Sequence, residues 1–162
     1  PDVTEGSETP VPLKAQADRW LILYLGYTHC PDVCPTSMVD LRDALAKAGE
    51  KVAKKFTTGF ITMDPTRDEP KRLTEYVNQF IPNSRAYRTL DDAQLKRFTN
   101  AVGGYYSITP PAEPGKEPIV AHSAQLYAVD AKGLVQCQWA YQTPVDTIAR
   151  DLKILADRPS KP

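Results

Sequence analysis

Residues 26–35 read Gly-Tyr-Thr-His-Cys-Pro-Asp-Val-Cys-Pro, between an apolar run at 20–25 and a stretch with helical spacing. They place Cys30 and Cys34 four positions apart. On a helix, residues i and i+4 share a face about 6 Å apart, so two thiols at this spacing can close a disulfide or bind one soft metal ion. The unpaired N–H groups at a helix N-terminus also favour thiolate over thiol. The cysteine pair is therefore predicted to be reactive toward disulfides or metals.

Strand and helix patterns alternate on both sides of this pair. The predicted strands span 20–27, 56–63, 86–89, 123–129 and 134–140. The predicted helices span 34–48, 70–80, 91–102 and 144–156. A β-α-β-α start followed by a hairpin and a last helix is typical of an α/β, thioredoxin-like fold. We expect a central mixed β-sheet flanked by helices, with the CxxxC motif at the first strand-to-helix turn.

Length and composition limit the class of protein. The 162 residues suit one domain, and we expect an irregular N-terminal lead-in at 1–19 before a domain over 20–162. Because 20 basic residues balance 20 acidic ones, no net charge attracts nucleic acid, and no nucleic-acid partner is expected. The longest apolar run, 20–25, is far shorter than the roughly 20 residues that span a bilayer.

His122 is the predicted third member of the site. It follows a proline-rich loop at 103–121 and precedes the predicted hairpin. In a thioredoxin topology this loop lies beside the cysteine turn, and two thiolates with one imidazole suit Cu(I). His29, directly before Cys30, is predicted to pack in the turn or support the site from behind.

Four further residues receive predictions. Asp64 ends the second buried strand at the edge where α/β proteins place their sites, so we expect it to orient the site or to meet a partner. Asp68 or Glu69 is predicted to cap the helix that starts at residue 70. Cys137 shares one face of the last strand with Val135 and Trp139 and is predicted to be a buried, inert core residue.

Three functions are compared for these residues. A copper-binding protein would hold one ion through Cys30, Cys34 and His122 and release it by ligand exchange. A thiol-disulfide oxidoreductase would use the two cysteines as a redox pair to reduce an acceptor, without needing His122. A peroxiredoxin-like peroxidase would need a basic residue beside its reactive cysteine, and the adjoining motif has no arginine.

Three motifs together resemble the Sco/SenC family of copper chaperones. They are residues 24–35 (YLGYTHCPDVCP), 64–70 (DPTRDEP) and 120–123 (VAHS), the last followed by Tyr127, Asp130 and Gly133. The resemblance implies a thioredoxin-like fold that holds copper, Cu(I) or Cu(II), through the thiolates of Cys30 and Cys34 and the imidazole of His122. Asp64 matches a family aspartate linked to the function of the site.

The same resemblance implies a role in building the dinuclear copper centre of cytochrome c oxidase. The expected partner is subunit II of the oxidase or another copper chaperone. The full-length protein is expected to be a membrane-anchored monomer facing the bacterial periplasm, or the mitochondrial intermembrane space. Reduction of the acceptor's cysteines before copper insertion is the alternative role.

Overall fold

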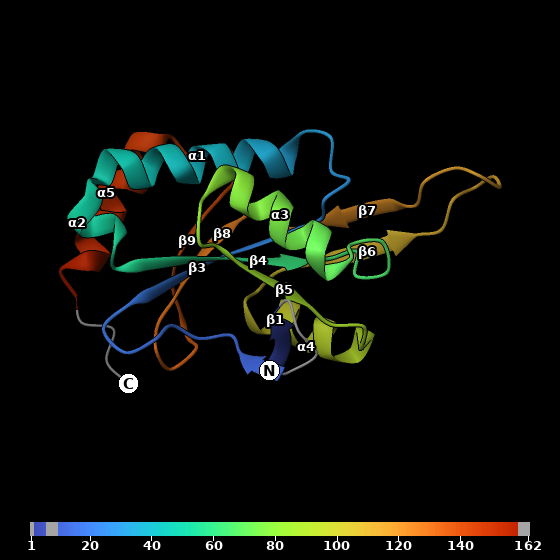
Figure 1. Cartoon of the computed structure of the whole chain (residues 1–162), viewed down its shortest axis with the longest axis horizontal. Helices are drawn as coiled ribbons and strands as arrows, with labels where there is room; N and C mark the ends of the chain where they lie inside the picture. Colours follow the sequence, from blue (N-terminus) through green and yellow to red (C-terminus); the bar gives the residue numbers. More distant parts are fainter. Residues whose placement is uncertain (1, 6–9, 159–162) are drawn as a thin grey trace.

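The computed structural model describes residues 2–5 and 10–158, and its centre is a seven-stranded mixed sheet (Figure 1). The strands are β1 (Asp2–Glu5), β2 (Pro10–Pro12), β3 (Trp20–Gly26), β4 (Phe56–Thr62), β5 (Arg85–Arg88), β8 (Leu126–Val129) and β9 (Val135–Trp139), in the order β2-β1-β5-β4-β3-β8-β9. The helices are α1 (Val33–Ala48), α2 (Glu50–Ala53), α3 (Pro70–Phe80), α4 (Asp92–Ala101) and α5 (Val145–Ala156). Strands β3, β4 and β5 pair in parallel, whereas β8, β9, β1 and β2 join antiparallel.

Strand β3 lies at the centre because every one of its residues is buried. Its side chains alternate between two cores, as the pleat requires. Ile22 and Tyr24 pack with residues of α1, α3 and α5 on one face, whereas Leu21, Leu23 and Leu25 pack with residues of α4 on the other. Figure 1 shows α1 and α5 above the sheet and α4 below it. The predicted mixed sheet flanked by helices, with the cysteines at the β3–α1 turn, is thus confirmed.

Residues 1–19 are expected to be an irregular lead-in, but the described part of this stretch contains two strands. Strand β2 pairs with β1, and β1 pairs antiparallel with β5, where Thr4 lies opposite Arg88. Both strands are short, the second contains two prolines, and the partner of β1 is some eighty residues away. Local periodicity therefore does not reveal them. The proposed domain boundary at residue 20 stays a prediction.

The proline-rich stretch at 103–121 was expected to be a loop, but it contains two strands. Strands β6 (Tyr106–Thr109) and β7 (Ile119–His122) pair antiparallel and form a second, two-stranded sheet. Tyr106 lies opposite His122 at its inner end. We call residues 106–122 the β6–β7 hairpin, and Figure 1 shows it projecting from the body of the domain. His122 thus comes from a strand end.

Within residues 2–5 and 10–158, no helix has the length and apolar character needed to cross a bilayer.

Candidate metal centre

Cys30, Cys34 and His122 come together at the carboxyl end of β3. Their two sulfurs and the imidazole nitrogen lie within 4.8 Å of one another, and Cys34 Sγ is 3.4 Å from His122 Nε2. Bonds of about 2.0–2.3 Å, as metals make to nitrogen and sulfur, allow ligand atoms to be up to about 4.6 Å apart. A small contraction would therefore let one ion contact all three atoms. Among the described residues, no other cysteine, histidine or carboxylate belongs to this group.

The two cysteines are held by the turn that leads into α1. The helix starts at Val33, close to the predicted start at residue 34, so Cys34 lies in its first turn and Cys30 precedes it. The chain turns back through a bond from the Cys30 N–H to the Tyr27 carbonyl, at 3.3 Å. The Cys34 N–H then donates to Cys30 Sγ, also at 3.3 Å. The Cys30 sulfur thus accepts from the helix N-terminus as a capping oxygen would.

The two thiols differ in acidity. The pKa of Cys30 is lowered to about 3, first because the Cys34 side chain hydrogen-bonds to its sulfur, and further by hydrogen bonds from backbone N–H groups. The pKa of Cys34 is raised, because its thiol keeps the proton that it shares with Cys30 and because it is buried. In the reduced protein Cys30 is therefore the thiolate and Cys34 the thiol.

His122 is oriented by its backbone and by two aromatic rings. Its Nδ1 lies 3.1 Å from the Ser123 carbonyl oxygen, which can only accept, so Nδ1 carries the proton and Nε2 presents a lone pair to the sulfurs. The rings of Tyr24 and Tyr27 meet the imidazole edge-on, with centroids 6.2 and 5.7 Å away. The imidazole is held in the orientation that a metal ligand needs.

Asp64 does not join the group of three. Its carboxylate is almost fully buried and accepts from the Arg67 guanidinium and, at 3.3 Å, from the Thr66 hydroxyl. Arg67 forms a second ion pair, with Glu117 in the β6–β7 hairpin. Through Arg67, Asp64 is thus connected to the hairpin that carries His122.

Asp68 is a site residue that sequence reasoning missed. Of the two residues predicted to cap α3, Glu69 holds the cap position, without a side-chain capping bond, and Asp68 does not. The fully buried Asp68 carboxylate instead accepts from the Thr28 N–H at 3.0 Å, and from the Thr28 and Thr62 hydroxyls, each at 2.6 Å. Thr28 lies two residues before Cys30, so Asp68 anchors the cysteine turn. The available signal was that the ends of parallel strands meet at one sheet edge.

His29 lies outside the group of three, with its side chain partly exposed. Its Nδ1 is 3.3 Å from Thr28 Oγ1 and 3.6 Å from a carboxylate oxygen of Asp68. His29 thus packs against the anchor of the cysteine turn.

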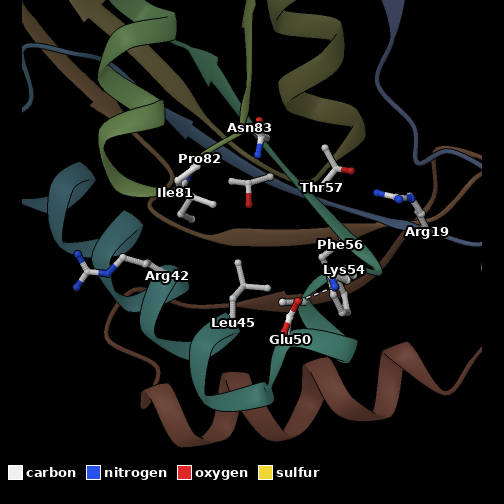
Figure 2. Close-up of a pocket in the computed structure, with 12 residues that line it drawn as sticks. Arg19, Arg42, Leu45, Glu50, Lys54, Phe56, Thr57, Ile81, Pro82 and Asn83 are labelled. Carbon is white, nitrogen blue, oxygen red and sulfur yellow. Dashed lines mark ion pairs between the residues drawn. The ribbon is translucent and has the colours of Figure 1, made fainter.

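A separate pocket of about 420 Å³ lies at the other end of the sheet (Figure 2). It is lined by the start of β4, by α2 and by residues 81–83, and its Lys54 is paired with Glu50 at 2.6 Å. Since Phe56 begins β4 whereas the cysteines follow the end of β3, this pocket is remote from the thiols. It holds no group of metal-binding side chains among the described residues.

Cys137 is not the fully buried residue that was predicted. It is partly exposed because β9 is an edge strand of the sheet, although it packs against the core that includes α5. Burial, and then the charge of Asp151, raise the pKa of its thiol. We therefore expect protonation, more than inaccessibility, to keep its reactivity low.

We expect the three thiols to respond differently to pH. Because Cys30 is a thiolate well below neutrality, its alkylation rate should be flat between pH 5 and 8, whereas the rate at Cys137 should rise about tenfold per pH unit. Buried Cys34 should stay unlabelled while the protein is folded. Iodoacetamide labelling followed by peptide mass spectrometry measures all three rates. A Cys30 rate that climbs with pH as the Cys137 rate does would contradict this assignment.

The fold and the group of three define a thioredoxin-like domain with a dithiol–imidazole centre. The chain belongs to the SCO1/SenC family, whose family model matches residues 2–157. The structure of Bradyrhizobium japonicum ScoI with copper bound is similar, at 28% identity and a TM-score of 0.77, covering 94% of this chain and 95% of that chain. The predicted thioredoxin-like fold and family are thereby confirmed.

Two relatives in the family are similar in sequence. Protein SenC of Rhodobacter capsulatus is 36% identical over 114 residues, which are 68% of this chain and 48% of that protein. The mitochondrial SCO1 homolog 1 of Arabidopsis thaliana is 34% identical over 109 residues, which are 67% of this chain and 32% of that protein. The chain thus spans less than half the length of either relative.

Proposed function

We propose that this chain is a copper metallochaperone that binds one copper ion through Cys30, Cys34 and His122. The observation that carries the proposal is the convergence of two sulfurs and one imidazole nitrogen within 4.8 Å. Soft thiolates are the ligands that Cu(I) prefers, and an imidazole suits Cu(II). The relationship to a ScoI structure solved with copper bound supports the same metal.

The residues present fit the binding and the release of copper. Cys30 is already a thiolate, whereas Cys34 releases its proton when it binds the metal, so loading is coupled to proton release. Cys30 and His122 are partly exposed while Cys34 is buried. An incoming ligand of an acceptor would therefore displace the exposed ligands first, and Cys34 last.

The proposed acceptor is the dinuclear copper centre of cytochrome c oxidase, in subunit II, with another copper chaperone as the alternative partner. Membership of the SCO1/SenC family supports this proposal. We further propose that the full-length protein is a monomer anchored in a membrane and facing the bacterial periplasm, or else the mitochondrial intermembrane space. The bacterial and mitochondrial relatives support these two locations.

The acidity of Cys30 favours a second candidate function, reduction of the acceptor's disulfide. The Cys30 thiolate would attack that disulfide and expel one acceptor thiolate, and Cys34, after losing its proton, would attack the Cys30 sulfur and release the second. The acceptor then carries two thiols, and the chain carries a Cys30–Cys34 disulfide. Both functions use the cysteines, and the copper function alone needs His122.

X-ray absorption of the reduced, copper-loaded protein tests the proposed ligand set. We expect one Cu(I) per chain with two sulfur ligands and one nitrogen ligand, because the described residues offer no fourth donor in the group. Oxidation to the disulfide should abolish binding, since it consumes both thiolates. Four sulfurs per copper would instead indicate two chains sharing one ion and would refute the site as proposed.

A further inference from the structure

One short segment contacts both halves of the proposed site. Residues 63–69, here called the β4–α3 loop, connect β4 to α3. Asp68 in this loop anchors Thr28, and with it the turn that carries Cys30. Arg67, its neighbour, forms an ion pair with Glu117 of the β6–β7 hairpin, which carries His122. The loop thus joins the thiol half to the imidazole half.

Arg67 is fixed from behind before it reaches the hairpin. Its Nε donates to the Asp64 carboxylate, whose side chain is 1% exposed, while a terminal nitrogen of the same guanidinium meets Glu117. The planar guanidinium can hold two carboxylates in one fixed geometry. The side chain of Glu117 is 76% exposed, so Arg67 is its anchor on the body of the domain. The ion pair thus links the buried Asp64 carboxylate, through Arg67, to an exposed part of the β6–β7 hairpin.

Glu117 is well placed to act on His122. It lies two residues before β7, and β7 ends at His122. Both ion-pair partners line a cleft of about 480 Å³, whose other lining residues come from the cysteine turn (Tyr27, His29) and from the hairpin (Pro118, Ile119, Val120). At the inner end the hairpin is held separately, by burial of Val120 and by a 2.6 Å hydrogen bond from Tyr106 to Asp92. The ion pair of Glu117 with Arg67 is thus a contact of the outer part of the hairpin with the body of the domain.

We propose that Arg67 is a positioning residue for His122. Backed by Asp64, it holds Glu117 and so keeps the β6–β7 hairpin, with its imidazole, against the cysteine turn. The ion pair sets how often the imidazole leaves the two sulfurs, and the sulfurs themselves are held by Asp68. This inference rests on the proposed function, because it assigns the ion pair an effect on copper exchange.

The expected effect is modest and selective. A partly exposed ion pair of this kind corresponds to about a two- to fivefold change in an equilibrium or rate. Because Cu(II) needs the nitrogen donor more than Cu(I) does, the effect should fall on Cu(II). Salt should weaken the pair by screening.

The test uses two variants of Glu117 and matched variants of Glu113. Glu113 is exposed in the same hairpin, and the described structure gives its carboxylate no ion pair, so Glu113→Gln and Glu113→Lys repeat each charge change without touching Arg67. We expect Glu117→Gln to release Cu(II) to EDTA about two- to fivefold faster than wild type, and Glu117→Lys faster still. The Glu113 variants should match wild type. Release from wild type should accelerate with salt more than release from Glu117→Gln.

Two further measurements separate positioning from general damage. The alkylation rate of Cys30 should be the same in all five proteins, because the cysteine turn is anchored by Asp68. In the metal-free reduced protein, NMR relaxation dispersion at residues 119–122 should increase in the Glu117 variants alone. Equal Cu(II) release from the Glu117 and Glu113 variants, or a parallel change at Cys30, would overturn the proposal.

The outcome also separates this inference from the proposed function. If wild-type protein binds no copper through a nitrogen ligand, the proposed function fails, whereas the metal-free relaxation data still decide whether Arg67 holds the hairpin. If wild type binds copper as proposed but relaxation at residues 119–122 is unchanged by Glu117→Lys, the function stands and the positioning role is refuted.

Discussion

Replacement of His122 by alanine should abolish stable Cu(II) binding while leaving the dithiol chemistry almost unchanged. The substitution removes the one nitrogen donor of the group and leaves two sulfurs, which can still hold Cu(I) more weakly. Attack of Cys30 on a disulfide depends on its thiolate, and the Cys34 hydrogen bond that contributes most to lowering its pKa remains in place. Cu(II) titration and the disulfide-reductase rate, measured on one preparation, give both readouts.

His29 provides the matched control for this experiment. It is the second of the two histidines, it directly precedes Cys30, and its side chain lies outside the group of three. His29→Ala should therefore keep Cu(II) binding. A reductase rate within about threefold of wild type in His122→Ala, roughly 0.65 kcal/mol in barrier terms, supports the chaperone function. Unchanged Cu(II) binding in His122→Ala would make the imidazole structural and favour the oxidoreductase.

The second large effect is expected at Asp68. Asp68→Ala should lower the free energy of unfolding by about 2–4 kcal/mol, because it leaves the Thr28 N–H and two threonine hydroxyls buried without their acceptor. For a domain of this size the melting temperature should fall by about 5–15 °C. Urea and thermal unfolding of the metal-free, reduced protein measure both quantities.

Asp43→Ala controls for the loss of a carboxylate as such. The Asp43 side chain is 49% exposed and pairs with the neighbouring Arg42, so its removal should cost less than about 0.5 kcal/mol. Asp68→Asn should fall between the two, since the amide keeps one acceptor oxygen and turns an N–H group toward donors. If Asp68→Ala proved as stable as Asp43→Ala, the anchoring of the cysteine turn by Asp68 would be refuted.

The centre of the fold was predictable because its signals are local. The apolar run at 20–25 and the spacing of α1 indicate a strand and a helix around the cysteines, and both are present. Strands β1, β6 and β7 were not predictable, because β1 pairs with β5 far along the chain and β6 and β7 flank a stretch rich in proline. Their pairing depends on tertiary contacts that propensity does not encode.

Some residues of the site were likewise predictable from the sequence, and others were not. Cys30, Cys34 and His122 were predicted from residue type and topology, and the structure places them together. Asp68 was missed because an acidic residue before a helix usually caps it, whereas here its carboxylate turns to Thr28 on the neighbouring strand connection. Glu117 gave no signal, since an exposed glutamate in a polar loop has a partner only after the chain has folded.

The two-stranded sheet of β6 and β7 is separate from the seven-stranded sheet. The hairpin can shift as a unit without breaking any backbone hydrogen bond between strands of the larger sheet. We therefore expect substitutions at its exposed positions, such as Ile108 or Thr109, to act on the placement of His122 more than on the folding equilibrium. For the proposed copper function, the rate of copper release and the thermal stability of the domain could therefore be tuned separately, by changing different parts of the same chain.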